Sequence, residues 1–138
     1  MKIIKLLFYT AIFSIMLFGS QLILSEVLKM YQNNELKNNQ SALELLEKQA
    51  IAGNINAAFL LATAYRNGKA GVIDLNKAMY WYEVSADSGD GDAMLMLGWL
   101  YYKAPKALDV NIKKAKYWFN KAASKGVDEA IEMLEILR

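Results

Sequence analysis

The 138-residue sequence predicts an all-α fold, a solenoid of helix-turn-helix repeats preceded by an N-terminal hydrophobic membrane helix. The first observation is an internal repeat, because residues 77–89 and 114–126 both begin Lys-Ala-x-Tyr-Trp and both end in glycine. Self-similarity at such a spacing is typical of stacked helical repeats. The second is that no segment alternates convincingly with period two, as strands do. The third is an uncharged run at residues 6–25.

Two helices are predicted in each repeat from the spacing of its apolar residues. Ala57, Leu61 and Tyr65 recur every four residues, which places them on one face of a first helix. Ala78 and Trp81 follow the same periodicity in a second helix. On this basis we expect helices over residues 40–52, 55–67, 75–88, 91–103, 111–125 and 128–137.

Polar and glycine residues mark the ends of these helices. Asp74 immediately precedes a second helix, where its carboxylate suits an N-cap. Gly89 and Gly126 follow the second helices, where a left-handed C-cap residue belongs.

Small and large residues recur at fixed places for reasons of packing. Ala57, Ala93 and Ala130 occupy equivalent positions at which neighbouring helices are expected to cross. A larger side chain there costs roughly 1–3 kcal/mol in overpacking. We expect Trp81 and Trp118 to fill the volume between successive hairpins, since one hairpin cannot bury its apolar face alone.

The repeated residues resemble the Sel1-like repeat, a relative of the tetratricopeptide repeat. That family has the pattern A-x-x-x-L-G-x-x-Y-x-x-G, a short loop with Asp, and then K-A-x-x-W-x-x-x-A-A-x-x-G. One unit matches it at Ala57, Leu61, Tyr65, Gly68, Asp74, Lys77, Ala78, Trp81, Ala86 and Gly89. The next matches at Ala93, Leu97, Gly98, Tyr101, Lys114, Ala115, Trp118, Ala122, Ala123 and Gly126.

The resemblance covers about residues 38–138 and implies a right-handed solenoid that recognises proteins without chemistry. It predicts a repeat domain over residues 40–138. This domain would hold about two full repeats, at 55–89 and 91–126, with partial helices on either side.

The N-terminus carries two basic residues, Lys2 and Lys5, ahead of the apolar run 6–25. About 20 apolar residues span a bilayer core, which favours an uncleaved signal anchor. A cleaved signal peptide is the alternative, although the small residues that cleavage needs are poorly supplied. A third interpretation, a buried helix of a cytoplasmic fold, fits this long uncharged run less well. Residues 26–39 are polar and are expected to form a spacer.

The positive-inside rule keeps Lys2 and Lys5 in the cytoplasm and sends the repeats across the membrane. We therefore expect a protein of the cell envelope, anchored in an inner membrane with its repeats in the periplasm. If the signal is cleaved, the protein would be periplasmic or secreted.

Composition argues against several functions. Lys2 and Lys5 account for the formal net charge of +2, so the rest of the chain lacks the basic surplus of a nucleic-acid binder. The chain has no His and no Cys, which removes the commonest general base, thiol catalysis and thiolate metal sites. We expect no enzyme activity, no cofactor and no metal.

An acidic cluster near a predicted turn could suggest a cation site. It consists of Asp87, Asp90 and Asp92. Aspartate is also favoured at caps and turns, and the 12-residue calcium-loop pattern does not follow. We therefore expect a structural role for these carboxylates.

An apolar stripe on the first helices exceeds what the repeat pattern requires. If the first helices line a concave face, methionine and aromatic side chains there suit contact with a partner peptide or helix. The alternative is that these residues are ordinary core, or are covered by the N-terminal helix. The candidate partner-binding residues are Leu60, Met94, Met96, Trp99, Tyr102 and Met133.

These observations favour a non-catalytic protein-binding or adaptor module of the cell envelope that contacts its partner through the concave apolar face. The alternative is a periplasmic immunity protein that neutralises a secreted effector toxin, a role that some signal-bearing relatives fill. Hydrolytic activity, claimed for some relatives, is the weakest interpretation because it needs a catalytic set that the sequence lacks.

Overall fold

The computed structural model describes residues 19, 23–103 and 110–138, and every regular element within this part is helical. Residues 23–32 are helical. They are followed by η1 (Leu36–Asn38), α2 (Gln40–Ile51), α3 (Ile55–Asn67), α4 (Leu75–Asp87), α5 (Gly91–Lys103), α6 (Ile112–Ser124) and α7 (Asp128–Ile136). The helices expected from residue 40 onward are all present, and each end lies within one residue of its predicted position.

Side-chain caps explain why the helices begin where they do. The carboxylate of Asp74 accepts a hydrogen bond from the backbone N–H of Lys77 at 2.9 Å, which confirms the predicted N-cap of α4. Side-chain oxygens of Asn39, Asn54 and Asn111 make the equivalent bond at the starts of α2, α3 and α6.

Glycines end the second helices as predicted. Gly89 and Gly126 have φ angles of 99° and 81°, in the left-handed region that side chains with a Cβ rarely adopt.

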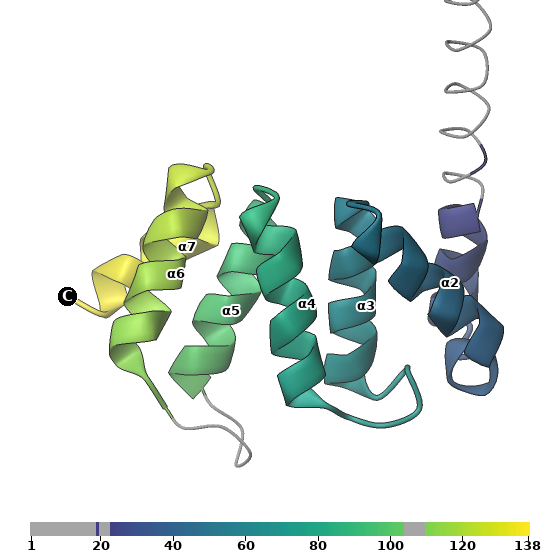
Figure 1. Ribbon diagram of the computed structural model, residues 1–138. Coiled ribbons are helices and arrows are strands. Elements are labelled where there is room, and N and C mark those ends of the chain that lie inside the picture. Colours follow the sequence, from purple (N-terminus) through teal and green to yellow (C-terminus); the bar gives the residue numbers. More distant parts are fainter. Residues whose placement is uncertain (1–18, 20–22, 104–109) are drawn as a thin grey trace, which may run out of the picture.

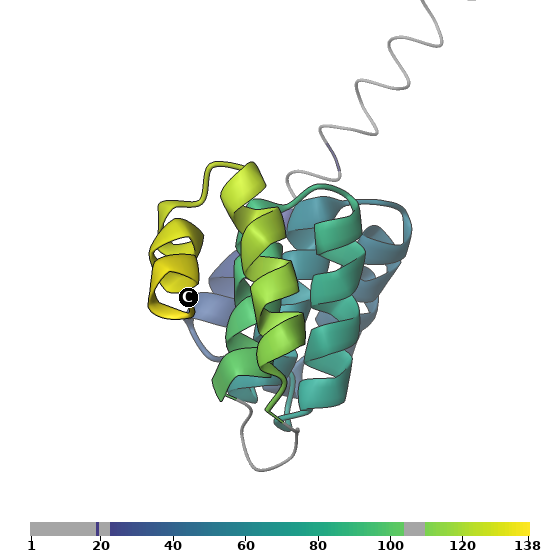
Figure 2. The same cartoon turned by 90° about the vertical axis from the view of Figure 1, so that its left-hand side faces the viewer.

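The helices form one row in chain order from α2 to α7 (Figure 1). Figure 2 looks along this row and shows the helices of successive repeats one behind the other. The extensive contacts within the described part join helices that are neighbours in sequence, α3 with α4, α5 with α6, and so on. Such nearest-neighbour packing is the arrangement of a helical solenoid.

The core is built from equivalent positions in successive repeats. Trp81 and Trp118 are buried, as expected. The residues that follow them, Tyr82 and Phe119, are buried more deeply and have no exposed surface. The hydroxyl of Tyr82 lies 3.0 Å from Thr63 Oγ1, which satisfies the polar end of this buried ring.

The structure differs from the prediction at residues 26–39, which we expected to be a polar spacer. Residues 23–32 form a helix whose Val27 is buried, and Leu36 in η1 has no exposed surface. This helix is tied to the end of α3, since Lys69 Nζ donates to the backbone oxygen of Tyr31 at 2.9 Å and lies 4.2 Å from the centre of its ring. The segment is thus part of the helical row.

The structure describes only part of the predicted membrane segment. Within the described residues, no helix combines the length and the apolar composition needed to cross a membrane. Most of the run at residues 6–25 lies outside the described part, so the anchor stays a prediction from the sequence.

Candidate functional site

An open cleft of about 370 Å³, which we call the α3–α5 cleft, lies between the end of α3, the loop that follows it, the start of α4 and one side of α5. Met96 and Trp99, two of the candidate partner-binding residues, lie half-buried in its wall. The cleft is lined by Arg66 from α3, Ile73 from the following loop, Leu75 from α4, and Met96, Trp99, Leu100 and Lys103 from α5. Among the described residues its lining is therefore apolar, with two cationic side chains and no acidic one.

The position of Trp99 is fixed from several sides. Its Nε1 donates to Glu129 Oε1 of α7 at 2.8 Å, and its ring meets the buried ring of Phe119 edge-on at 5.7 Å. Tyr102 packs against the same ring at 5.7 Å, and Lys103 Nζ lies 4.3 Å from its centre. Trp99 thus presents a preformed aromatic surface to the cleft.

Arg66 reaches across from α3 to α5. Its Nη1 donates to Met96 Sδ at 3.4 Å, a weak acceptor. Its Nε is buried without any hydrogen-bond partner. Within the described residues, the thioether of Met96 is the one hydrogen-bond acceptor that this guanidinium contacts.

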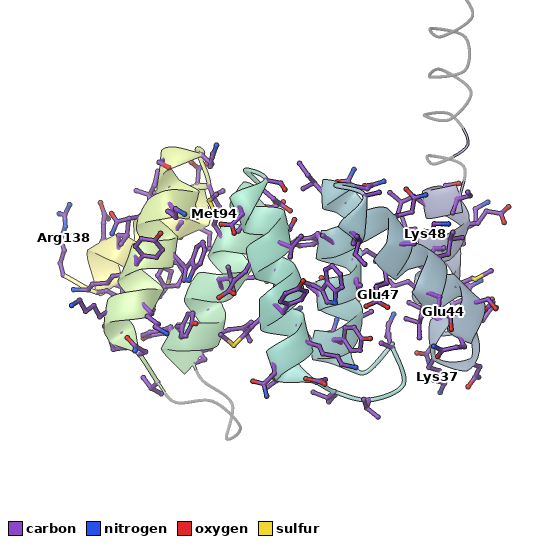
Figure 3. The ribbon with its side chains drawn as sticks, viewed as in Figure 1. Lys37, Glu44, Glu47, Lys48, Met94 and Arg138 are labelled. Atoms are coloured by element: carbon purple, nitrogen blue, oxygen red, sulfur yellow. The ribbon has the colours of Figure 1, made fainter. Side chains whose placement is uncertain are left out.

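Three of the candidate partner-binding residues are buried and cannot contact a partner as Met96 and Trp99 can. Met94 and Met133 are 4% and 5% exposed and belong to the core. Figure 3 shows Met94 within the array of helices rather than at its edge. For these two residues the structure favours the alternative interpretation, a core role.

Leu60 is also buried, at 8% exposure. It lies beside a second cavity, of about 430 Å³, between residues 23–32 and α3. The other lining residues are Leu24, Leu28, Tyr31, Asn56, Phe59 and Thr63. The N-terminal helix thus flanks the α3 portion of the stripe, and Met96, Trp99 and Tyr102 are the candidates that keep partial exposure.

Asp90, one member of the aspartate cluster, takes the structural role expected for it. Asp90 Oδ1 accepts from the backbone N–H groups of Asp92 and Ala93 at 3.0 and 3.2 Å, at the start of α5. Its Oδ2 accepts from the hydroxyl of the buried Ser85 at 2.6 Å. Asp87 is exposed. No group of three or more potential ligands in the described residues is placed to hold a metal ion.

The pKa values of two groups near the repeat interfaces are raised by their surroundings. Burial raises the pKa of the Tyr82 phenol, and the hydrogen bond with Thr63 and the charge of Arg66 offset this only in part. Burial, together with Asp87, raises the pKa of the Glu83 carboxyl. Neither group lines the α3–α5 cleft, so neither serves as an acid or base there.

The sequence prediction did not include the two cations of the cleft. Arg66 and Lys103 each lie in the last turn of a first helix, where a basic residue also suits the helix dipole. Only the three-dimensional arrangement of the two repeats shows that they line one cleft. The sequence offered one signal of these unpaired cations, namely that neither Arg66 nor Lys103 has an acidic residue next to it in the chain.

Elsewhere the surface carries mixed charges. Figure 3 shows Glu44, Glu47 and Lys48 on α2, with Lys37 nearby, at the other end of the row from Arg138. All four side chains near α2 are exposed, and two are basic and two acidic. This is an ordinary solvated face.

The geometry defines a helical-repeat protein, and comparison with known families agrees. The model of the Sel1 repeat matches residues 20–54, 55–90 and 91–127. The chain belongs to the Sel1 repeat family. The first match includes residues 23–32 and α2, so the region expected to hold a spacer and a partial helix holds a third repeat.

Solved structures show the same fold. A Sel1 repeat protein from Oxalobacter formigenes is 29% identical, with a TM-score of 0.56, over 64% of this chain and 66% of that one. The chain thus spans just under two thirds of that protein's length. Cysteine-rich protein B of Helicobacter pylori is 27% identical, with a TM-score of 0.64, over 84% of this chain and 95% of that one. No curated protein matches the chain significantly in sequence.

Members of this family generally mediate protein–protein interactions. The present chain carries its repeats without any cysteine, although its Helicobacter neighbour is described as rich in cysteine. Packing and caps must therefore hold the hairpins together here.

Proposed function

We propose that the protein is a non-catalytic adaptor of the cell envelope that binds a protein partner through the α3–α5 cleft. The observation that carries this proposal is the half-buried pair Met96 and Trp99 in the wall of an apolar cavity. Binding sites of this kind are concave, mostly apolar and preformed. Methionine adapts to an irregular partner surface, and a fixed Trp supplies contact area at little entropic cost.

The position of the cleft supports the proposal further. Residues of two successive repeats line it, so a partner seated there would contact both repeats. The mixed charges around α2 would contribute little to affinity, since exposed ion pairs are weak.

Site-specific photo-crosslinking in cells tests the proposal. A photoreactive phenylalanine analogue replaces Tyr102, at the edge of Trp99, or Tyr80, which is 58% exposed on a second helix. We expect a discrete adduct from position 102 and none from position 80. Equal adducts at both positions would show that the cleft has no special role.

Polar substitutions provide the matching loss-of-function test. Met96→Gln keeps the length of the side chain, and Met96→Gln combined with Trp99→Gln removes the apolar wall. We expect the double variant to lose the adduct while its melting temperature changes little. Control changes at Lys121 in α6 and Glu132 in α7, which do not line the cleft, should leave the adduct intact. A folded double variant that still forms the adduct would place the site elsewhere.

The envelope location is a separate part of the proposal. It is supported by Lys2 and Lys5, the uncharged run at residues 6–25 and the positive-inside rule. Protease added outside the inner membrane should degrade the repeats. A fusion reporter at the C-terminus that is active only in the cytoplasm would contradict this topology, and the mass of the N-terminus distinguishes an anchor from a cleaved signal.

A further inference from the structure

The α3–α5 cleft combines an apolar wall with two cations that form no ion pair with a carboxylate of the described residues. Arg66 and Lys103 both line it, together with five apolar side chains. Among the described residues, Arg66 donates a hydrogen bond only to the thioether of Met96, and its buried Nε finds no acceptor there. Lys103 lies over the face of Trp99 at 4.3 Å. Neither cation forms an ion pair with a carboxylate among the described residues.

This arrangement leaves the charge of Arg66 poorly compensated. A guanidinium presents a planar fork of donors that matches a carboxylate, whereas a thioether sulfur accepts only weakly. Partial burial also strengthens any charge interaction that a ligand could offer. The cleft is therefore better prepared for a negatively charged group than for a neutral or a positive one.

The two cations of the cleft do not reflect an overall basic charge of the chain. Beyond Lys2 and Lys5 the chain has equal numbers of basic and acidic residues. A surface that attracts nucleic acid needs an extended basic stripe. Here two cations border a cavity whose remaining walls are Ile73, Leu75, Met96, Trp99 and Leu100. The lining selects a ligand that is acidic at one point and apolar beside it.

We infer that the cleft takes a peptide segment of the partner protein in which an Asp or Glu lies next to a large apolar side chain. The carboxylate contacts Arg66 or Lys103, and the apolar side chain packs on Met96 and Trp99. The volume of about 370 Å³ lies near the lower end of the range for ligand pockets, about 300–1,000 Å³, which suits an anchor of this size. This inference rests on the proposed binding function and specifies the chemistry of the partner.

Synthetic peptides test the inference on the full-length protein in detergent. The probes are fluorescein-labelled octapeptides with a central Glu-Phe or Asp-Leu pair in a Gly-Ser background. Their controls carry Gln-Phe, Asn-Leu or Lys-Phe instead. Fluorescence anisotropy measures the Kd of each. A hydrogen bond to a charged group contributes more free energy than a tenfold change in Kd requires. We therefore expect acidic peptides to bind at least about tenfold more tightly than their amide counterparts. The difference should shrink as salt is raised.

Variants assign the preference to the cleft. Arg66→Gln and Lys103→Gln together should abolish the preference for acidic peptides. Lys103→Gln alone, at an exposed position on the last turn of α5, should reduce it without affecting folding. Arg66→Lys keeps the charge but loses the fork, and should weaken binding of acidic peptides. Lys113→Gln, on the exposed side of α6, is the matched control and should change nothing.

The outcomes separate this inference from the proposed function. Equal binding of acidic and amide peptides, weakened by Met96→Gln, would overturn the acidic requirement and leave the cleft as a binding site. A preference for acidic peptides that survives in the Arg66→Gln, Lys103→Gln variant would place the cationic site elsewhere and overturn the inference. Failure of all the peptides to bind would also overturn it, whereas the crosslinking experiment decides the proposed function independently.

Discussion

The ring of Phe119 occupies the space that a side chain at Gly98 would need. A Cβ built on Gly98 would lie 2.5 Å from both Cδ1 and Cε1 of Phe119, well inside any real contact. Gly98 lies in α5 and Phe119 in α6, so this close approach joins the two helices of one hairpin. The preceding repeat has the buried Ala62 at the equivalent place. Both repeats therefore need a small residue here, but the position of Gly98 has less room for a Cβ.

This relationship predicts the effect of adding a single methyl group. Gly98→Ala should destabilise the protein by about 1–3 kcal/mol through overpacking, despite the better helix propensity of alanine. Urea unfolding measures the change. If the clash with Phe119 is the cause, Phe119→Leu should cost less in the Gly98→Ala background than in the wild type, because the two sites are coupled. Purely additive costs would contradict this explanation.

The three tryptophans should differ in their contribution to stability. Trp81 and Trp118 are 5% and 8% exposed, so replacing either by alanine should cost about 3–5 kcal/mol. Trp99 is half-buried beside the α3–α5 cleft, and Trp99→Ala should cost markedly less. Chemical denaturation of the three variants gives the comparison. Equal losses would mean that Trp99 is core and that the cleft has been wrongly interpreted as a binding surface.

Tyr82 should make stability depend on pH in the alkaline range. Burial raises the pKa of its phenol above the usual 10.0, so the folded state holds the proton more firmly than the unfolded state. The resulting stabilisation is complete below pH 10 and is lost as pH rises through the higher folded pKa.

The variant Tyr82→Phe should therefore lose less stability than the wild type when pH is raised above about 10. Urea unfolding at a series of pH values measures both slopes, and titrations of other tyrosines and lysines cancel in the difference. Tyr82→Phe should also cost roughly 1 kcal/mol at neutral pH, because the hydrogen bond with Thr63 is lost. Identical slopes for the two proteins would rule out a shifted pKa at Tyr82.

Helix positions could be predicted well because the signals that set them are local. The caps at Asp74 and Asn111 and the left-handed glycines at Gly89 and Gly126 each act within one turn of their own helix. The composition of the α3–α5 cleft depends instead on how two distant helices stack. The sequence indicated Met96 and Trp99 through their apolar stripe, yet it could not show that Arg66 would lie against Met96.

Burial within the stripe was equally hard to predict. Leu60 and Met133 occupy the same repeat position as Met96, and Met94 lies two residues before it, but whether each of these side chains is covered depends on its neighbours in the next repeat. Residues 23–32 illustrate the same difficulty. Leu24, Val27, Leu28 and Tyr31 recur there with helical spacing, but the asparagines that follow indicate a spacer, and only the three-dimensional packing shows that Val27 is buried.

The role of residues 23–37 leads to a test by truncation. Fully burying a Val or Leu side chain contributes about 1.5–3 kcal/mol, and both Val27 and Leu36 are buried here. A fragment of residues 38–138 lacks both side chains, and it also loses the bond from Lys69 to Tyr31 and the cover over Phe59 and Leu60. It should melt at a clearly lower temperature than a fragment of residues 23–138, as followed by far-UV circular dichroism.

The matched control is residues 23–138 with Glu35→Gln, an exposed change in the same segment that should leave the melting temperature unchanged. Equal melting temperatures for the two fragments would mean that the repeat domain begins at α2 and that residues 23–37 only rest against it.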